Sequence, residues 1–421
     1  MSGGSGGIVG IAGGGGGALA GVRVVELCDP SAEYCGRMLA GLGADVVKAE
    51  PPQGAPSRSI GPFADDVEDP DGSLSFWADN VGKRSVVVED DDEVLALCRA
   101  ADVMVHTLRA PESKRRGLDH ASLSARFPRL VVCAVTPFGQ SGPWASYEAD
   151  DLVLMALGGS MAACGYRPGP DGSYDTPPLA AMGDQAWRTA STYAAIAILA
   201  ALYAGADDGT GQFIDVSAHE CSASMTEWHL LTYLCSGAVY KRAPHPTLTA
   251  ADGRRVAALV PDFLGPHVFE KLLAVLEDNG VAGALSDPAF MDPAHRAAHY
   301  SELWGALKRL ASLFDGETLW RLGQSAGLPW GVIRSPDEVV GDSHLKARGH
   351  FVALEHEEPD RADDGTDGPG GRSRSVVYPG APFIAHGSPW VTDRPPPRLG
   401  EHTAEVKADW NIGMPRAQDH A

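Results

Sequence analysis

The chain of 421 residues lacks a long hydrophobic run. Its most apolar stretch, residues 193–203, is about half as long as the roughly 20 residues that a membrane-spanning helix needs. The N-terminus also lacks the basic segment that precedes the apolar core of a secretory signal. We therefore expect neither a membrane segment nor a signal peptide.

The cysteines lack a pairing pattern. Seven are scattered along the chain, with no Cys-x-x-Cys pair and no Cys/His spacing typical of a zinc site. An odd, unpatterned set fits a reducing compartment. We expect a cytoplasmic protein without a disulfide framework and without a metal site.

Positive charge is scarce as well. The chain has 34 Lys and Arg against 55 Asp and Glu, a formal net charge of −21. This excess of negative charge argues against nucleic acid and anionic membranes as partners. It does not argue against a small anionic ligand, because a few local Lys and Arg side chains can hold a phosphate.

Short apolar segments alternate with helical segments through the first half of the chain. Such alternation is typical of an α/β protein, in which helices cover both faces of a parallel sheet. The expected strands are residues 22–27, 44–48, 84–88, 103–106 and 130–135, and the expected helices include residues 34–42 and 90–101.

The pattern becomes mainly helical after residue 217, and the length exceeds one comfortable core, so we expect two lobes. The later helical stretches are residues 220–236, 269–276, 299–313 and 318–325. We divide the chain into a flexible Gly-rich tail (1–20), a large domain (21–222), a small domain (223–335) and a C-terminal segment (336–421), within which residues 355–375 are expected to be a disordered loop.

One carboxylate lies directly before the apolar helix in the middle of the chain, in the segment Gly183-Asp184-Gln185. Burying an ionised carboxylate is costly, and a poorly solvated carboxylate is a stronger nucleophile toward an activated acyl group. A simple helix cap is the other reading of Asp184. The residues alone leave both roles open.

A set of short motifs is spread in order over residues 21–406. They are LGADVVKAEPP (42–52), GKRSV (82–86), ADVMV (101–105), RRGL (115–118), FPRLV (127–131), FGQSGP (138–143), GDQ (183–185), GTGQFIDVS (209–217), AGLPWGV (326–332), DSHLKARG (342–349) and LGEHT (399–403). Together they resemble the class III CoA-transferases, a family that includes formyl-CoA and carnitine CoA-transferases and the 2-methylacyl-CoA racemases.

The resemblance implies a fold and an activity. The fold is a Rossmann-like large domain with a parallel sheet plus a smaller α+β domain, and two chains are threaded through each other as an interlocked homodimer. The activity moves CoA from an acyl-CoA donor to a free carboxylic acid. Coenzyme A is a substrate, and no tightly bound cofactor or metal is needed. The C-terminal segment is expected to return to the large domain.

The resemblance also implies roles for particular residues. Asp184, after Gly183, matches the family's catalytic aspartate, which forms an aspartyl anhydride and then an aspartyl-CoA thioester. The alternative carboxylate is Asp175, in a Gly- and Pro-rich loop. The positions that match CoA-binding residues are Lys83, Arg84, Thr107, Arg115, Thr136 and Phe138.

The chain departs from the family pattern in three places. The spacing from Asp184 to the apolar part of its helix is about three residues longer than usual, which is nearly one helical turn. Ala32-Glu33 replaces a Gly-Pro pair, so a buried Glu33 is expected to repel an acid substrate. Pro261 stands in a loop that is glycine-rich in the family, and proline has no amide hydrogen for an oxyanion.

Other functions remain as alternatives. A racemase needs a histidine where this chain has Asp150, so proton exchange at the α-carbon is disfavoured. His219 is expected to be a packed structural histidine. A non-catalytic CoA-binding subunit of the same fold is a second alternative. A dehydrogenase is remote, because no GxGxxG motif lies between a strand and a helix.

Overall fold

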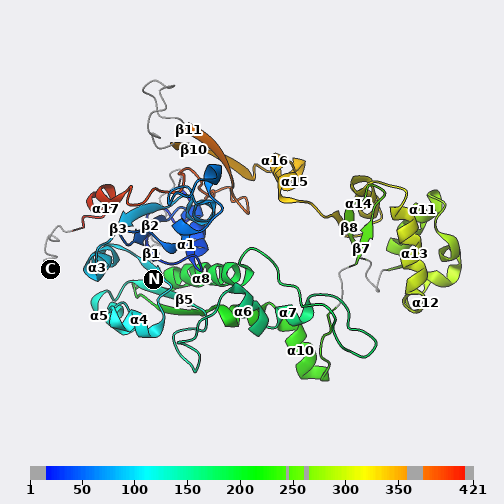
Figure 1. The fold of residues 1–421 in the computed structure, drawn as a ribbon, viewed down its shortest axis with the longest axis horizontal. Helices are drawn as coiled ribbons and strands as arrows, with labels where there is room; N and C mark the ends of the chain where they lie inside the picture. Colours follow the sequence, from blue (N-terminus) through cyan, green and yellow to red (C-terminus); the bar gives the residue numbers. More distant parts are fainter. Residues whose placement is uncertain (1–15, 243–245, 260–264, 358–372, 413–421) are drawn as a thin grey trace, which may run out of the picture. The chain divides into compact units, whose positions relative to one another are not determined.

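The computed structural model describes residues 16–242, 246–259, 265–357 and 373–412 (Figure 1). The chain divides into two compact units: a large unit within residues 1–242 and 344–421, and a small unit within residues 243–343. The small unit therefore begins and ends later than the 223–335 that we expected. The segment up to residue 242 stays with the large unit because its helices follow directly from the sheet.

Six parallel strands form the main sheet of the large unit, in the order β3-β2-β1-β4-β5-β6. The order reverses between β1 and β4, and in doubly wound α/β folds ligands bind at the carboxyl ends of the strands at such a point. The predicted parallel sheet is confirmed. The strands are β1 (Arg23–Leu27), β2 (Asp45–Glu50), β3 (Arg84–Val87), β4 (Val103–His106), β5 (Val131–Thr136) and β6 (Phe213–Ser217).

Alternate residues of these strands enter two separate cores, because successive side chains in a strand point to opposite faces. Val103 and Val105 pack with α1 (Glu33–Gly41) and α8 (Gln185–Ala204) on one face. Met104 packs on the other face. The helices of that second core are α3 (Asp91–Ala100), α5 (His120–Arg126) and α17 (Thr403–Asp409).

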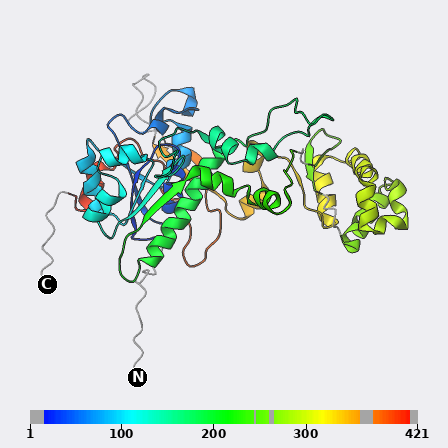
Figure 2. The same ribbon diagram turned by 90° about the horizontal axis from the view of Figure 1, so that it is seen from below.

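Helix α8 is a single continuous helix of 20 residues and begins at Gln185. Its buried side includes Ala186, Ala190, Ala194 and Ile198, which recur every four residues and so lie on one side of the helix. Small side chains let the helix run close to β5 and β6, as Figure 2 shows for the long green helix beside the strands.

The rest of the large unit connects or flanks these layers. Its elements are η1 (Pro56–Ser59), η2 (Ala64–Asp66), α2 (Leu74–Asn80), α4 (Ala110–Arg115), α6 (Asp151–Leu157), α7 (Ser160–Ala163), α9 (Ala218–Ser224), α10 (Glu227–Ser236), β10 (Phe351–Glu357) and β11 (Ser373–Pro379). Helix α16 (Ser343–Ala347) follows the end of the small unit.

The small unit combines a three-stranded antiparallel sheet with helices around an apolar core, as expected for an α+β domain. Three predicted helical stretches fall in α11, α13 and α14. Its elements are β7 (Thr247–Thr249), β8 (Arg255–Ala258), β9 (Trp330–Val332), α11 (Pro266–Asp278), η3 (Gly283–Ser286), η4 (Pro288–Met291), α12 (Pro293–Ala298), α13 (Tyr300–Ala311), α14 (Gly316–Ser325) and α15 (Pro336–Val340).

The C-terminal segment packs on the outer strand of the large sheet. The amide of His402 donates to the Ser85 carbonyl oxygen at 3.0 Å, and the amide of Val87 donates to Thr403 Oγ1 at 3.1 Å. The LGEHT motif therefore satisfies backbone groups of β3 that an edge strand leaves unpaired.

Two expectations about disorder are wrong at their edges. Within residues 355–375, Glu355 pairs with Ser375 in the antiparallel hairpin of β10 and β11, because Leu354 and Tyr378 bury their side chains beside Val81. The remainder, 358–372, lies outside the described residues. In the expected tail, Leu19 is buried and its amide donates to the Leu42 carbonyl oxygen at 2.8 Å. None of the described helices is both long and apolar enough to cross a membrane.

Candidate active site

Asp184 lies at the start of α8 in a conformation that is rare for a residue with a side chain. Its φ and ψ are 53° and 47°, in the left-handed region, and it follows Gly183 with φ 87°. Its carboxylate makes no capping hydrogen bond to the helix. Such a backbone costs on the order of 1–3 kcal/mol and persists where surrounding structure holds it. The cap that we considered for Asp184 is therefore not its role.

A second carboxylate caps α8 in place of Asp184. Asp151 Oδ1 accepts hydrogen bonds from the amides of Ala186 at 2.8 Å and Trp187 at 3.3 Å. Burial raises the pKa of Asp151; these amide bonds oppose that effect, and the nearby charge of Asp184 adds to it. Among the described residues, Asp151 therefore supplies the cap of α8, and the Asp184 carboxylate does not take part in it. Sequence reasoning missed Asp151, because its partners lie more than thirty positions away.

The surroundings of Asp184 differ from our expectation in one respect. We expected a poorly solvated carboxylate, but Asp184 is exposed in the single chain. The three additional residues before the apolar part of α8 are helical. Compared with the usual family spacing, they move Asp184 about 4.5 Å along the helix axis. This is nearly one helical turn, so Asp184 stays on about the same side of the helix.

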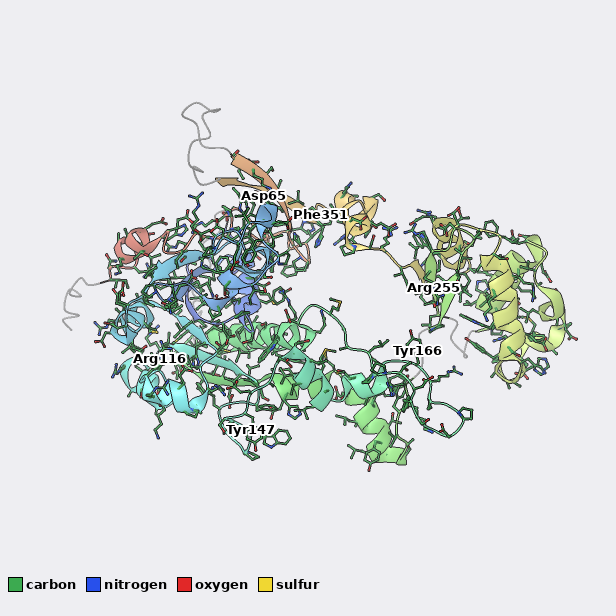
Figure 3. The ribbon with its side chains drawn as sticks, viewed as in Figure 1. Asp65, Arg116, Tyr147, Tyr166, Arg255 and Phe351 are labelled. Carbon is green, nitrogen blue, oxygen red and sulfur yellow. The ribbon has the colours of Figure 1, made fainter. Side chains whose placement is uncertain are left out.

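The carboxyl ends of β1 and β4 meet at the reversal of strand order. The amide of Asp29 donates to Thr107 Oγ1 at 3.1 Å, which joins the two strand ends. Arg115 ends α4, the helix that follows β4, and is exposed. Thr107 therefore lies on the strand–helix connection where this fold binds ligands, and Arg115 lies in the last turn of the helix that follows. Figure 3 labels Arg116, the next residue, beside α4.

The end of β5 carries the other two predicted CoA residues that lie near this edge. Thr136 is buried, and its Oγ1 has no hydrogen-bond partner among the described residues. Phe138 lies in an aromatic group with Trp144, Tyr147 and His219, whose ring centroids are 5.6 Å, 6.4 Å and 5.6 Å from its own. Figure 3 shows Tyr147 on the segment after β5. Trp144 and Tyr147 were not predicted.

Two of the sequence motifs contact each other at this edge. The amide of Gln140, in FGQSGP, donates to both carboxylate oxygens of Asp215, in GTGQFIDVS, at 2.9 and 3.0 Å. Gln140 Nε2 also donates to the Leu108 carbonyl oxygen at 2.9 Å. Gly139 has φ 81°, which lets the chain turn toward Asp215. The contact explains why both motifs occur together: each fixes the segment that leaves β5 next to β4.

Lys83 does not reach a CoA phosphate in this chain. It is fully buried, and its Nζ donates to both Glu26 oxygens at 2.9 and 2.8 Å, to Asn80 Oδ1 at 2.9 Å and to the Glu33 carbonyl oxygen at 2.7 Å. A Lys ammonium has three hydrogens, so these acceptors use all of them. The sequence could not reveal this, because a Lys at the start of a strand is usually exposed.

Arg84 is occupied as well. Its guanidinium forks onto Asp45 and also bonds Glu405 at 3.0 Å and Asp409 at 2.9 Å, both on α17. Arg84 therefore fastens the C-terminal helix to the sheet instead of facing a ligand. We remove Lys83 and Arg84 from the residues assigned to CoA.

The structure also locates other residues that the sequence analysis singled out. Asp150, at the position of the racemase histidine, caps α6 by accepting from the Val153 amide at 2.8 Å. His219 is half-buried and packs its ring against Phe138 and Trp144, which agrees with the packed structural histidine that we expected. Asp175 is exposed in the loop before α8. Pro261 lies outside the described residues.

Comparison with known proteins identifies the family. A model of CoA-transferase family III matches residues 19–403. The chain belongs to CoA-transferase family III. It is an enzyme of that class.

Relatives of family III match over nearly the whole chain. The succinate–glutarate CoA-transferase of Agrobacterium fabrum strain C58 is 31% identical over 408 residues, 93% of this chain and 95% of that protein. The formyl-CoA:oxalate CoA-transferase of Streptomyces avermitilis is 28% identical and covers 92% and 94%. A crystal structure of a CaiB/BaiF family protein from Brucella suis matches with a TM-score of 0.77 at 28% identity, covering 94% and 100%.

Proposed function

We propose that this family III enzyme moves CoA from an acyl-CoA donor to a free carboxylic acid, with Asp184 as the nucleophile. The free, uncapped Asp184 carboxylate on a left-handed turn is the observation that supports it. The left-handed backbone of Asp184 costs free energy, and Asp151 caps α8 in its place. Both observations fit a catalytic role for the Asp184 carboxylate. Relatives whose names include succinate, oxalate and glutarate support small carboxylic acids as the substrate class.

The reaction conserves the thioester without a metal or redox step. The Asp184 carboxylate attacks the acyl carbonyl and releases CoA thiolate, which gives a mixed anhydride. The thiolate then attacks the aspartyl carbonyl and releases the donor as its carboxylate, which leaves an aspartyl-CoA thioester. The acceptor carboxylate attacks the carbonyl carbon of this thioester, which releases CoA thiolate and forms a second mixed anhydride. CoA thiolate then attacks its acyl carbon, which yields the new acyl-CoA and restores Asp184.

Binding of CoA is assigned to the carboxyl ends of β4 and β5. The exposed cation Arg115 suits a phosphate, and Phe138 adds an apolar wall. Thr107 and the unpartnered hydroxyl of Thr136 offer polar contacts at the same edge. These four residues remain from the six that we predicted.

We also propose a homodimer, and α10 supports it. None of its residues is buried in the single chain, and Trp228 and Leu234 are each 75% exposed. Figure 1 shows α10 projecting from the large unit, away from the sheet. An apolar helix left open to water is typical of an interface with another chain. The family resemblance supports an interlocked arrangement of the two copies, and the unpatterned cysteines support a cytoplasmic location.

The nucleophile is tested by a matched pair of variants. We expect Asp184→Ala to abolish CoA transfer between an acyl-CoA and a free acid, while the affinity for CoA changes by less than about 1 kcal/mol. Asp175→Ala removes an exposed carboxylate from the preceding loop and should leave transfer intact. Normal turnover by Asp184→Ala would remove this residue from the mechanism, and loss in both variants would point to the loop instead.

A further inference from the structure

Glu33 is a buried carboxylate that the proposed mechanism does not use. It is the first residue of α1, directly after the connection from β1, and is 1% exposed. Three side chains bind it. Lys48 Nζ lies 2.7 Å from Oε1, Ser57 Oγ donates to Oε1 at 2.6 Å, and Asn80 Nδ2 donates to Oε2 at 2.8 Å. We call Lys48, Ser57 and Asn80 the carboxylate pocket.

Two of the three donors of the carboxylate pocket, Lys48 and Asn80, are also held by contacts that do not involve Glu33. Lys48 Nζ also bonds Glu26 at 3.2 Å and the Cys28 carbonyl oxygen at 3.1 Å. Asn80 also donates to the Phe76 carbonyl oxygen at 3.0 Å, and its Oδ1 accepts from Lys83. Removal of the Glu33 side chain should therefore leave an open, preorganised site and not a collapsed one.

The charges of the pocket select an anion. Burial alone would raise the pKa of Glu33, but the nearby Lys48 and Lys83, with the hydrogen bonds from Lys48 and Ser57, lower it below its usual value. Without Glu33, the two ammonium groups share Glu26 as their close carboxylate partner. A buried positive charge left without its counter-ion is costly, so the emptied pocket should take up a small carboxylate from solution.

The helix that carries Glu33 contacts the start of α8. Tyr34 follows Glu33, and the Arg188 guanidinium lies over its ring at 4.4 Å. Arg188 is in the first turn of α8, where its amide donates to the Asp184 carbonyl oxygen at 2.8 Å. The turn that presents Asp184 and the helix that carries Glu33 are therefore joined by one stacking contact.

We propose that Glu33 is an internal carboxylate that fills an anion site at the start of α1, the helix that stacks on the first turn of α8, and so determines acid specificity. In the wild type it closes the Lys48–Ser57–Asn80 pocket to the carboxylates of free acids. Because Glu33 is paired, it does not repel an acid substrate as we expected; it excludes a second carboxylate by occupying its place. The specificity consequence rests on the proposed function, whereas the pocket itself does not.

The pocket is tested without activity. We expect the thermal midpoint of Glu33→Ala to rise saturably in acetate, by about 5 °C relative to chloride at equal ionic strength. Wild type and Glu33→Gln both keep the pocket filled. Each should therefore have the same thermal midpoint in acetate as in chloride. If Glu33→Ala folds poorly, its refolding yield is compared in acetate and chloride. An equal response of Glu33→Ala to both salts would overturn the proposal.

The specificity is tested by turnover. In Glu33→Ala we expect the ratio of kcat/KM for succinate over kcat/KM for propionate as acceptor to rise about tenfold relative to wild type, because a second carboxylate can enter the pocket. An unchanged ratio, with acetate bound, would overturn the specificity role. If wild type shows no transfer at all, the proposed function fails. The acetate measurement still tests whether the carboxylate pocket of Glu33→Ala binds an anion.

Discussion

Two parts of the large unit treat charge in opposite ways. Under α1 and α2, three carboxylates and three cations are sealed together with no side chain more than 2% exposed; we call this group the ionic cluster. Beyond β4 and β5, Arg115 at the end of α4 is exposed, and Thr136 Oγ1 at the end of β5 has no hydrogen-bond partner among the described residues. The ionic cluster comprises Glu26, Glu33, Glu50, Lys48, Lys83 and Arg58.

The difference shows that a basic motif does not by itself identify a ligand site. The motifs GKRSV and RRGL both carry positive charge. In the first, Lys83 and Arg84 form ion pairs with protein carboxylates, whereas in the second Arg115 is exposed to solvent. A buried ion pair holds its partners in place, while an exposed cation such as Arg115 is available to a phosphate. Four predictions test this contrast, in order of the size of the effect.

The largest effect is expected from the ionic cluster. Lys83→Met should lower the free energy of unfolding by about 3–5 kcal/mol, because Glu26 is left buried with one cation fewer. Urea unfolding at fixed protein concentration measures it. Arg115→Gln is the matched control and should change stability by less than about 0.5 kcal/mol. Equal stability of the two variants would erase the contrast.

Acid should weaken the ionic cluster next. The pKa values of Glu33 and Glu50 are lowered in the folded state despite burial, by Lys48 and Lys83 for Glu33 and by Arg58 and Lys48 for Glu50. Their ionised forms therefore contribute stability that is present above the unfolded value near 4.5 and is lost as pH falls through the lower folded value. In urea unfolding below pH 4.5, Glu33→Gln should lose less stability per pH unit than wild type. Identical slopes would speak against this reading.

A moderate effect is expected at Arg115, the last residue of α4. Arg115→Gln should weaken CoA binding about tenfold, because one charge-assisted contact to phosphate is lost. Arg126→Gln, in the last turn of α5 and also exposed, is the control. Equilibrium binding of CoA at constant salt gives both values. If the two variants bind CoA equally well, Arg115 is an ordinary surface charge.

The smallest change in stability is expected at the start of α8. Asp151→Ala should cost about 1 kcal/mol of unfolding free energy, the usual value of a helix cap, and should lower kcat more than it changes KM. Asp151→Asn keeps an acceptor and should restore much of the rate. Asp150→Ala removes the cap of α6 and should cost similar stability without lowering kcat. Parallel losses of kcat in both alanine variants would mean that Asp151 only stabilises the fold.

The sequence predicted the architecture better than the site. Alternation of short strands and helices is a local signal, and it placed the parallel strands β1 to β5 and the helices α11, α13 and α14. The roles of Lys83 and Asp151 depend on partners distant in the chain, Glu26 and the α8 amides, so no local pattern could assign them. The aromatic group around Phe138 depends likewise on how the segment after β5 folds back.

The most direct test of the account is to catch the enzyme in mid-reaction. Incubation with an acyl-CoA and no acceptor acid, followed by digestion and mass measurement, should find CoA or acyl mass on the peptide that contains Asp184. Hydroxylamine should remove the adduct, and Asp184→Ala should carry none. An adduct on another carboxylate, or rapid transfer with no adduct in wild type, would contradict the central role of Asp184.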